Sequence, residues 1–435
     1  MSHSSLFRPP RTRVPHTFDA FRTFSYRMLW PANFFAYISR WMQITLLSWF
    51  VLELTDSPFF VALVGFFAMV PLLLFGVFGG VLADRVDRHR LLMFSQVSNF
   101  ALSLAMIALL LSGREEFWHA YVVVLLTGVG WSLDMPARRS VVHDLFGKAS
   151  LTNAMALDSV GMHASRMLGP TIAGGMIAAA SVTGGYILMA LFLGTSIVFM
   201  ALARLPAHRA GLPAARSIAR NLAEGFSYVL GNRLILATVV VTVLMNMLLF
   251  PYMQMLPVIA RDSLGVGPGL MGLLMGADGL GAIVGSITIA SVGTIKYHGR
   301  IFLGGSVIGL IMSIGFALSN SFAMALPILV LLGLGTAGFG TMQATIVLLA
   351  AKEDMRGRAL GVISLAIGAG PIGALIIGAL ASSLGPGVAI TILSTTGLLA
   401  ITLVTLLMPR LRGQIGESRE ADPRDTPKPA MQSAS

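Results

Sequence analysis

Long apolar stretches with almost no charge recur along the whole chain of 435 residues and constrain it more than any other feature. Apolar residues make up 55% of the sequence and charged residues 11%. An ordinary soluble domain has roughly 25% charged residues, so this chain cannot cover a surface that faces water and must lie in lipid. Since one spanning helix takes about 20 apolar residues, little of the chain remains for a soluble catalytic domain.

Apolar runs bounded by charge, glycine or proline predict an all-α membrane protein with twelve transmembrane helices. Their expected ranges are 29–53, 58–83, 91–112, 117–135, 152–180, 183–203, 234–258, 268–292, 301–319, 322–350, 359–383 and 387–408.

Basic residues are distributed unevenly over the connections between these segments. Most of the 30 Lys and Arg follow the even-numbered segments or lie in the two tails. By the positive-inside rule this predicts that both termini are cytoplasmic, in the cytoplasmic (inner) membrane. The net charge of +11 therefore reflects orientation in the membrane, and no nucleic-acid partner is expected. The chain has no cysteine, and we expect neither a metal nor a cofactor.

The two halves of the chain repeat one pattern. Pro58 and Arg90 in the first half are matched by Pro268 and Arg300 in the second. Six crossings return a chain to its starting side, which predicts two like-oriented six-helix bundles related by a pseudo-twofold axis along the membrane normal. The expected organisation is a cytoplasmic tail at 1–27, a bundle at 28–203, a cytoplasmic linker with an interfacial helix at 204–233, a bundle at 234–409 and a disordered cytoplasmic tail at 410–435.

Three motifs resemble one known family. The first is Gly80-Val81-Leu82-Ala83-Asp84-Arg85-Val86-Asp87-Arg88-His89-Arg90, between the second and third predicted helices. It resembles the signature loop of the major facilitator superfamily, Gly-x-Leu-Ala-Asp-Arg-x-Gly-Arg-Arg. Asp87 replaces the second glycine, as in the branch that holds the enterobactin and macrolide exporters. Residues 128–139 and 164–175 also resemble that branch, and the similarity covers residues 22–408.

The first motif predicts a conformational latch. A carboxylate at Asp84 could pair with a basic residue at the start of the eleventh helix and also meet the positive end of that helix. The alternative is that the basic residues of the loop only fix topology. The expected members of the latch are Gly80, Asp84, Arg85, Arg88, Arg356 and Arg358.

A second set of motif residues lies in the fifth helix. Gly169, Pro170, Gly174 and Gly175 resemble a motif of the superfamily's antiporters. The proline bends the helix and the glycines permit close backbone contact. The resemblance favours export over uptake. The alternative is that these residues form a kink that serves only helix packing and says nothing about the direction of transport.

Ionisable residues inside the membrane are the most informative, because each costs about 2.5–3.5 kcal/mol at the centre of a helix unless it is paired or hydrated. Arg166 and Asp278 both fall near mid-depth at 1.5 Å per residue. The fifth and eighth helices of the superfamily face one another, so we predict an ion pair between the two halves.

Three further residues are candidates for proton coupling. Asp158 and His163 share the fifth helix with Arg166 and could pass protons, although a lone buried histidine is more often simply hydrogen-bonded. Asp134 is a third candidate. The fourth-helix arginine usual in proton antiporters of the superfamily has no counterpart between Tyr121 and Trp131.

Polar stripes on three helices predict a substrate cavity, because a polar face on a spanning helix does not point into lipid. For Arg40 the alternative is a structural pair, for example with Asp158. The expected cavity residues are Asn33, Tyr37, Arg40 and Gln43 on the first helix, Thr127 and Trp131 on the fourth, and Asn246, Tyr252 and Gln254 on the seventh.

These features together predict a secondary active transporter that exports amphipathic small molecules, such as drugs, macrolides or siderophores, by alternating access and proton antiport. The alternatives are an uptake permease and a lysophospholipid transporter of the same fold. An enzyme is disfavoured because no nucleophile motif is present, and ATP because no phosphate-binding loop is present. The expected partners are a small-molecule substrate, the bilayer and protons, with the chain acting as a monomer.

Overall fold

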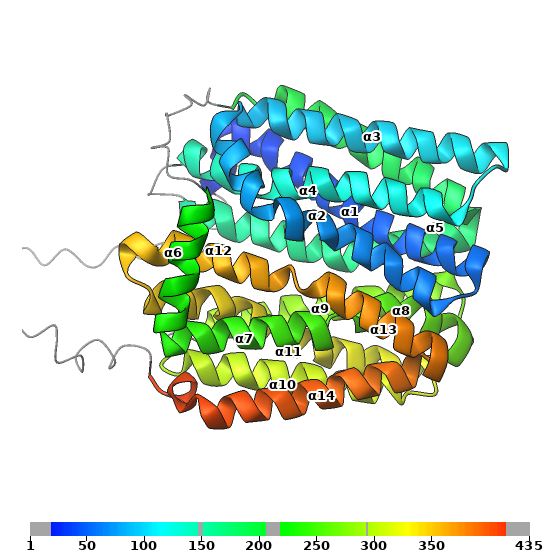
Figure 1. Cartoon of the computed structure of the whole chain (residues 1–435). Helices are drawn as coiled ribbons and strands as arrows, with labels where there is room; N and C mark the ends of the chain where they lie inside the picture. Colours follow the sequence, from blue (N-terminus) through cyan, green and yellow to red (C-terminus); the bar gives the residue numbers. More distant parts are fainter. Residues whose placement is uncertain (1–18, 147–150, 206–217, 293–294, 415–435) are drawn as a thin grey trace, which may run out of the picture.

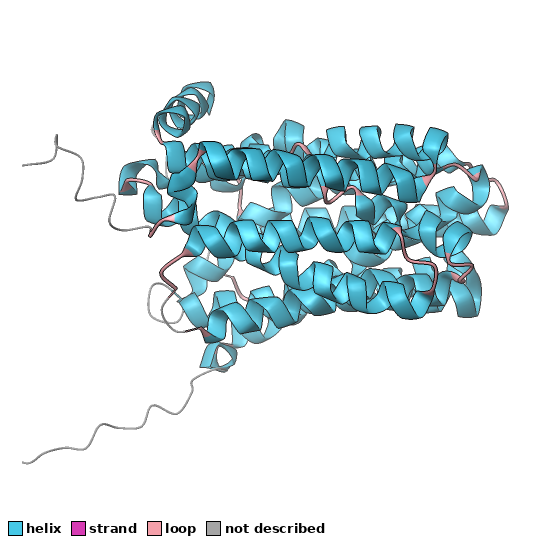
Figure 2. Cartoon of the chain, turned by 90° about the horizontal axis from the view of Figure 1, so that it is seen from below, coloured by secondary structure: helices cyan, strands magenta, loops and turns pink. Residues whose placement is uncertain are grey.

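All regular secondary structure among the described residues is helical (Figure 2). The computed structural model describes residues 19–146, 151–205, 218–292 and 295–414. The first half of the chain forms η1 (Asp19–Arg22), α1 (Phe24–Thr55), α2 (Pro58–Arg85), α3 (Arg88–Ser112), α4 (Phe117–Phe146) and α5 (Leu151–Leu202). The linker contains α6 (Ile218–Gly231). The second half forms α7 (Arg233–Leu248), α8 (Tyr252–Val258), η2 (Ile259–Ser263), α9 (Pro268–Ser291), α10 (His298–Ala317), α11 (Phe322–Ala350), η3 (Glu353–Met355), α12 (Arg356–Ile367), α13 (Gly370–Leu384), α14 (Pro386–Leu407) and η4 (Pro409–Arg412).

Helix α5 crosses the membrane layer twice. Its 52 residues would be about 78 Å long if straight, more than twice the hydrocarbon thickness. Non-helical backbone at Ala180 and Ser181 interrupts it. Both ends of α5 lie beside the start of α1, since Tyr26 donates to the carbonyl oxygen of Ala154 at 2.8 Å and Ser25 donates to that of Arg204 at 2.6 Å. The chain therefore runs out and back, as the two predicted segments 152–180 and 183–203 require.

Twelve crossings result. Ten segments of the described chain are long and apolar enough to span a membrane, and one of them, 153–202, holds both passages of α5. Helix α1, with 32 residues, lies alongside α5 and supplies the remaining crossing. The seventh and eleventh crossings are each broken next to a proline, Pro251 between α7 and α8 and Pro371 after α12, because proline removes a backbone donor. The prediction of an all-α fold with twelve crossings in two six-helix bundles is confirmed.

Several predicted boundaries are too narrow. The helix expected at 117–135 continues to Phe146 and carries Pro136 inside it. The tail expected to be disordered from residue 410 begins with η4, which is packed, because Leu411 is fully buried and the Arg412 carbonyl oxygen accepts a hydrogen bond from Arg300 at 3.1 Å. Residues 415–435 lie outside the described residues.

The helices run along one common direction, with α1 to α5 (the N half) stacked on α7 to α14 (the C half), and α6 crosses their ends (Figure 1). We call the end at which α6 lies the basic end, because Arg88, Arg204, Arg300 and Arg358 belong to the helix termini there. The other end is called the opposite end. The described chain starts and stops at the basic end.

The halves touch backbone to backbone near the opposite end, where α5 packs on α9. A Cβ atom added to Gly174 would lie 2.8 Å from the Gly272 Cα atom, and one added to Gly272 would lie 2.5 Å from the Pro170 carbonyl oxygen. Only glycine permits helices to approach this closely. Small residues therefore set the distance between the halves on this side.

A polar contact reinforces this closure at the opposite end. The Arg261 side chain, which follows α8, makes an ion pair with Asp56 at the end of α1. Arg261 also donates from Nη1 to the Leu52 carbonyl oxygen at 3.2 Å. Helices α2 and α13 join the halves too, since a Cβ atom on Gly378 would lie 2.7 Å from that of Ala62. The structure is closed between the halves on this side.

Replacing Gly174 by valine should hold the opposite end apart, since even its Cβ atom meets the α9 backbone. Gly175→Val is the matched control, because no atom lies within 4 Å of a Cβ at that position. Cysteines placed at the exposed Arg114 and Asn320 of this cysteine-free chain allow spin-label distances across the opposite end to be measured. Gly174→Val should lengthen that distance and Gly175→Val should not. Equal distances in both variants would contradict the account.

Candidate functional site

An ion pair joins the two halves at mid-depth. Arg166 of α5 donates from Nη2 to Asp278 Oδ2 of α9. The Asp278 side chain is 1% exposed and that of Arg166 is 19% exposed. Arg166 Nη2 also lies 3.9 Å from the Met253 sulfur, and the guanidinium is 5.5 Å from the centroid of the Trp41 ring. The structure thus brings together the two residues that sequence analysis placed at mid-depth.

The packing of α9 on both sides brings Asp278 to this position. A Cβ atom on the next residue, Gly279, would lie 2.7 Å from the Met167 backbone nitrogen of α5. One added to Gly333 of α11 would overlap the carbonyl oxygen of Asp278 itself. Glycines therefore let α9 fit tightly between α5 and α11, and the Asp278 side chain is buried there.

A cavity of about 290 Å³ lies between the halves, on the basic-end side of the ion pair. Its wall comes from α5, α9, α11 and the turn after α7. We call it the central cavity. Its polar and aromatic lining includes His163, Arg166, Phe250, Ser286, Thr336 and Phe339. Of the residues predicted from sequence to form the site, only His163 and Arg166 belong to this wall.

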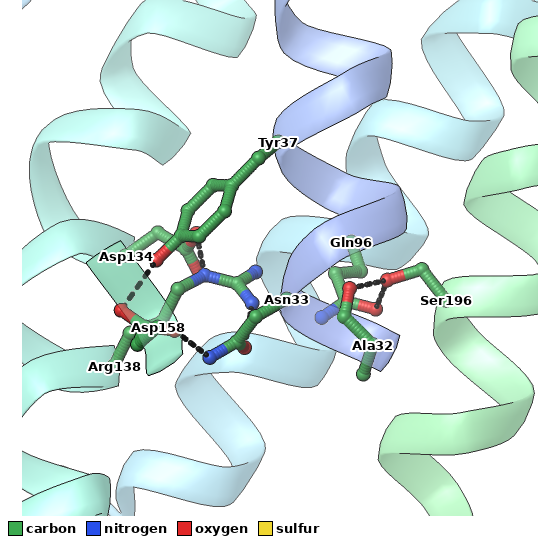
Figure 3. Close-up of polar contacts among 8 residues, drawn as sticks. All are labelled: Ala32, Asn33, Tyr37, Gln96, Asp134, Arg138, Asp158 and Ser196. Atoms are coloured by element: carbon green, nitrogen blue, oxygen red, sulfur yellow. Dashed lines mark hydrogen bonds and ion pairs between the residues drawn. The ribbon is translucent and has the colours of Figure 1, made fainter. Parts of the chain in front are cut away.

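A second polar cluster is enclosed within the N half (Figure 3). Arg138 of α4 donates from Nε to Asp134 Oδ2 at 2.6 Å and from Nη1 to Asn33 Oδ1 of α1. Asp158 of α5 accepts from Asn33 at 3.0 Å and from the Tyr37 hydroxyl at 3.4 Å. Three helices of one half are thereby tied together. We call these five residues the N-half network.

The returning part of α5 is tied to the same half. Ser196 donates to the Ala32 carbonyl oxygen at 2.6 Å and accepts from the Gln96 side-chain amide nitrogen at 2.9 Å (Figure 3). All three residues are buried. The polar contacts of the N half therefore reach from α1 to α3 and both passages of α5, which favours movement of this half as one body.

Arg138 is the functional candidate that sequence analysis missed. The predicted range 117–135 leaves Arg138 among the basic residues that follow the fourth helix, yet its side chain is 2% exposed. Helix α4 continues past Pro136, so Arg138 lies inside the half and not in a loop. The spacing of Asp134 and Arg138, four residues apart, is the signal that could have found it.

Arg40 also lies within the N half. It donates from Nη1 to Thr127 Oγ1 at 3.3 Å and from Nη2 to the Ala68 carbonyl oxygen at 3.2 Å. Thr127 in turn donates to Gln43 Oε1 at 2.9 Å. Arg40 does not pair with Asp158, whose bonds go to α1 residues of the N-half network. The Arg40 stripe therefore faces other helices of its own half, not the central cavity.

Two further stripe residues border a small side pocket. Tyr37, Trp131 and Asp158 line a space of about 60 Å³ together with Met162. The Tyr37 and Trp131 rings meet edge to face, with centroids 5.9 Å apart. Met162 also belongs to the wall of the central cavity, so the side pocket adjoins that cavity.

The three residues predicted on the seventh helix do not line the described wall of the central cavity. Asn246 donates to the Thr242 carbonyl oxygen of its own helix at 2.9 Å. Tyr252 is 1% exposed and interacts electrostatically with Asp278 and Arg166, behind that wall. Gln254 reaches across to α2, since a Cβ atom on Gly65 would lie 2.5 Å from its side-chain oxygen. None of the three belongs to the described wall of the central cavity, to which the same segment contributes Phe250.

Part of the predicted latch lies outside the described residues. Gly80 and the side chains of Asp84 and Arg85, at the end of α2, belong to this part. Arg88, at the start of α3, makes an ion pair with Asp144 of α4, within its own half.

The two arginines expected to receive Asp84 have other acidic partners. Arg358 Nη1 of α12 lies 3.1 Å from Glu224 Oε2 of α6. Arg356 Nη1 lies 3.8 Å from Oε1 of Glu353, which belongs to the turn before α12. The linker helix α6 is thus bound to the C half at the basic end. Its Glu224 contacts Arg358, one of the two arginines that the predicted latch would use.

The fifth-helix motif serves two contacts. A Cβ atom on Gly169 would lie 2.6 Å from the Trp41 Cβ atom of α1, within the N half. Pro170 and Gly174 face α9 in the closure described above. A Cβ atom added to Gly175 would meet no other part of the protein within 4 Å. Within the described residues, no group of three His, Asp or Glu side chains is arranged to hold a metal ion.

Comparison with known proteins identifies the family to which the chain is similar. A family profile described as transmembrane secretion effector matches residues 16–434. The chain is 24% identical to the staphyloferrin A transporter of Staphylococcus aureus, over 87% of this chain and 93% of that protein. It is 26% identical to the multidrug efflux pump Tap of Mycolicibacterium fortuitum (85% and 92%) and 27% identical to the enterobactin exporter EntS of Shigella boydii (76% and 78%).

Solved structures share the fold at low identity. A POT family transporter in complex with 5-aminolevulinic acid superposes with a TM-score of 0.73 at 12% identity, covering 89% of this chain and 96% of that one. A bacterial homologue of the human lysosomal transporter Spinster, in an inward-facing and unoccupied conformation, gives 0.64 at 13% identity, covering 94% and 100%. These likenesses establish the arrangement of the helices.

Replacing Arg138 by leucine should destabilise the protein by about 3–5 kcal/mol, because it leaves buried carboxylates without their cation. Unfolding by denaturant in detergent, followed by tryptophan fluorescence, measures the change. Arg410→Leu, at an exposed arginine, is the control. The double variant Asp134→Asn, Arg138→Gln should recover part of the loss. A loss for Arg138→Leu no larger than that of the control would show that the N-half network does not stabilise the half.

Proposed function

The chain belongs to the transmembrane secretion effector family of the major facilitator superfamily, and from this premise we propose that it exports amphipathic small molecules by alternating access. It is a multi-pass membrane transporter. The relatives named above are described as siderophore or multidrug transporters, which supports export of drugs, macrolides or siderophores.

The observation that carries the proposal is the difference between the two ends of the interface. Near the opposite end the halves meet backbone to backbone at Gly174 and Gly272. On the basic-end side of Arg166 and Asp278 they enclose the central cavity. A transporter that alternates needs a site that is closed toward one side, and the backbone contact near the opposite end supports this arrangement.

The basic end is proposed to face the cytoplasm of the cell, because basic residues concentrate there. The central cavity would then load from the cytoplasm, which is the loading side of an exporter. Both termini would be cytoplasmic, in the inner membrane. The latch residue Asp84 and the linker helix α6 would act at this face, where α6 already holds Arg358. The chain would work as a monomer, since both halves of the site come from one chain.

Coupling to protons is proposed to use Asp278. Movement of the halves apart at the opposite end would separate it from Arg166, and an unpaired buried carboxylate takes a proton rather than stay charged. When the halves meet again, a buried guanidinium needs an anion beside it, so Arg166 would expel that proton toward the basic end. Protons would thus enter as substrate leaves. His163, in the wall of the central cavity, lies on the route of release.

Transport into proteoliposomes tests this proposal. Vesicles with an acidic interior should accumulate at least one compound of a panel of ethidium, erythromycin and iron-free enterobactin, because proton efflux drives antiport. Asp278→Asn should abolish the dependence on the pH gradient while leaving exchange of labelled for unlabelled compound. Glu353→Gln, at an exposed carboxylate, should behave like the unmodified protein.

Two outcomes would count against the proposal. If no panel compound moves under any gradient although the protein is folded, export is not supported. If Asp278→Asn still concentrates a compound against its gradient, the proton does not bind at Asp278.

A further inference from the structure

The wall of the central cavity is basic. Its described lining contains Arg166 and His163, three residues apart on α5, and no Asp or Glu. Asp278 is not part of this wall and is 1% exposed, because it lies behind the guanidinium. A ligand in the cavity therefore meets the cation of the ion pair and not its anion.

Arg166 has donors left over after pairing with Asp278. A guanidinium carries five N–H groups. Among the described residues, Nη2 has two partners, Asp278 and the Met253 sulfur, whereas the buried Nε has none. The side chain is 19% exposed. A planar guanidinium with free donors binds a carboxylate more strongly than it binds a neutral acceptor.

The rest of the wall suits the body of an amphipathic molecule. The Phe250 and Phe339 rings pack together with centroids 5.9 Å apart. Ser286 and Thr341 add hydroxyl groups. The volume, about 290 Å³, is near the lower limit of pockets for small organic ligands. The space therefore offers an apolar, partly aromatic surface beside one basic corner.

We propose that the central cavity selects substrates with an acidic group, which binds the free side of Arg166 with His163 as a second donor. This inference rests on the proposed function and names its substrate class. It also explains how the ion pair can open. When Asp278 moves away with the C half, the acidic group of the substrate keeps the buried guanidinium paired, whereas an empty cavity would leave it without an anion. Cationic molecules are disfavoured by repulsion from Arg166.

Three dansyl probes with the same fluorophore and different charge test the proposal: dansylglycine (anionic), dansylamide (neutral) and dansylcadaverine (cationic). The full chain is placed in nanodiscs of phosphatidylcholine, and the signal of empty nanodiscs is subtracted. Dansylglycine should bind at least about tenfold more tightly than dansylcadaverine, as expected for a guanidinium–carboxylate contact. Arg166→Gln should abolish this preference and Arg166→Lys should keep part of it. Equal or tighter binding of dansylcadaverine would overturn the proposal.

Two control variants keep the test valid. Arg166→Gln leaves Asp278 buried without a partner, so the double variant Arg166→Gln, Asp278→Asn is measured as well, and it too should lose the preference for dansylglycine. Arg410→Gln changes an exposed arginine at the basic end and should leave the preference intact. A preference that survives in the double variant would show that Arg166 does not select the acid.

The acidic group could belong to a soluble acid or to a lipid head group, and competition separates these sources. Displacement of dansylglycine by lysophosphatidylglycerol and not by lysophosphatidylcholine would identify a lipid. Displacement by 2-naphthoate and by neither lipid would identify a soluble acid. Equal displacement by both lipids, with none by 2-naphthoate, would contradict recognition of charge.

Failure of this inference is distinguishable from failure of the proposed function. Gradient-driven flux of dansylamide or dansylcadaverine without tighter binding of dansylglycine would leave export standing and overturn the acid site. Acid-selective binding without gradient-driven flux of any probe would support the site and count against export.

Discussion

A charge held inside a membrane is costly unless it is paired or hydrogen-bonded, and this constraint organises the structure. Two clusters meet it in different ways. In the N-half network, Arg138 is balanced by Asp134 within one half, so nothing has to change when the halves move. The pair of Arg166 and Asp278 joins different halves, so any separation of the halves must break it or replace one partner. The first cluster is therefore suited to rigidity and the second to coupling.

Closure of the opposite end depends on backbone contact. Since α5 and α9 meet at Gly174 and Gly272, no side chain separates their backbones at this point. The ion pair between Arg261 and Asp56 is at the rim, where water can solvate both groups after separation. At the basic end the linker helix α6 is bound to α12 through Glu224 and Arg358, so it travels with the C half. The interface thus combines a contact of small residues with one buried pair that opposes its opening.

Sequence predicted the features that depend on counting along the chain. The lengths of the apolar runs predicted the positions of the crossings. The helical rise per residue predicted that Arg166 and Asp278 lie at the same depth, and the structure pairs them there. The ends of helices were harder to predict. Because Pro136 is tolerated inside α4, the helix continues past the predicted end, and Arg138 lies in the helix instead of in a loop. Neighbouring helices can satisfy the backbone that a proline frees in a membrane.

Hydrogen-bond partners on other helices could not be predicted from the polar stripe of a single helix. A helical wheel shows that Arg40 and Gln43 share a face, but not that Thr127 and the Ala68 carbonyl oxygen occupy it. Gln254 likewise belongs to a polar stripe, yet it packs against Gly65 of the other half. His163 and Arg166 line the central cavity, whereas the expected stripe residues Asn246 and Tyr252 do not.

Reversal of the charge pair is the most direct test of its role between the halves. Gradient-driven transport is compared in Arg166→Asp, in Asp278→Arg and in the double variant that carries both changes. Each single reversal puts two like charges side by side in a buried site, so both should lose transport. The double variant restores an ion pair of the opposite sense and should recover a measurable part of the transport. A double variant that transports no more than the single variants, with the protein still folded, would show that the two residues do not act through one another.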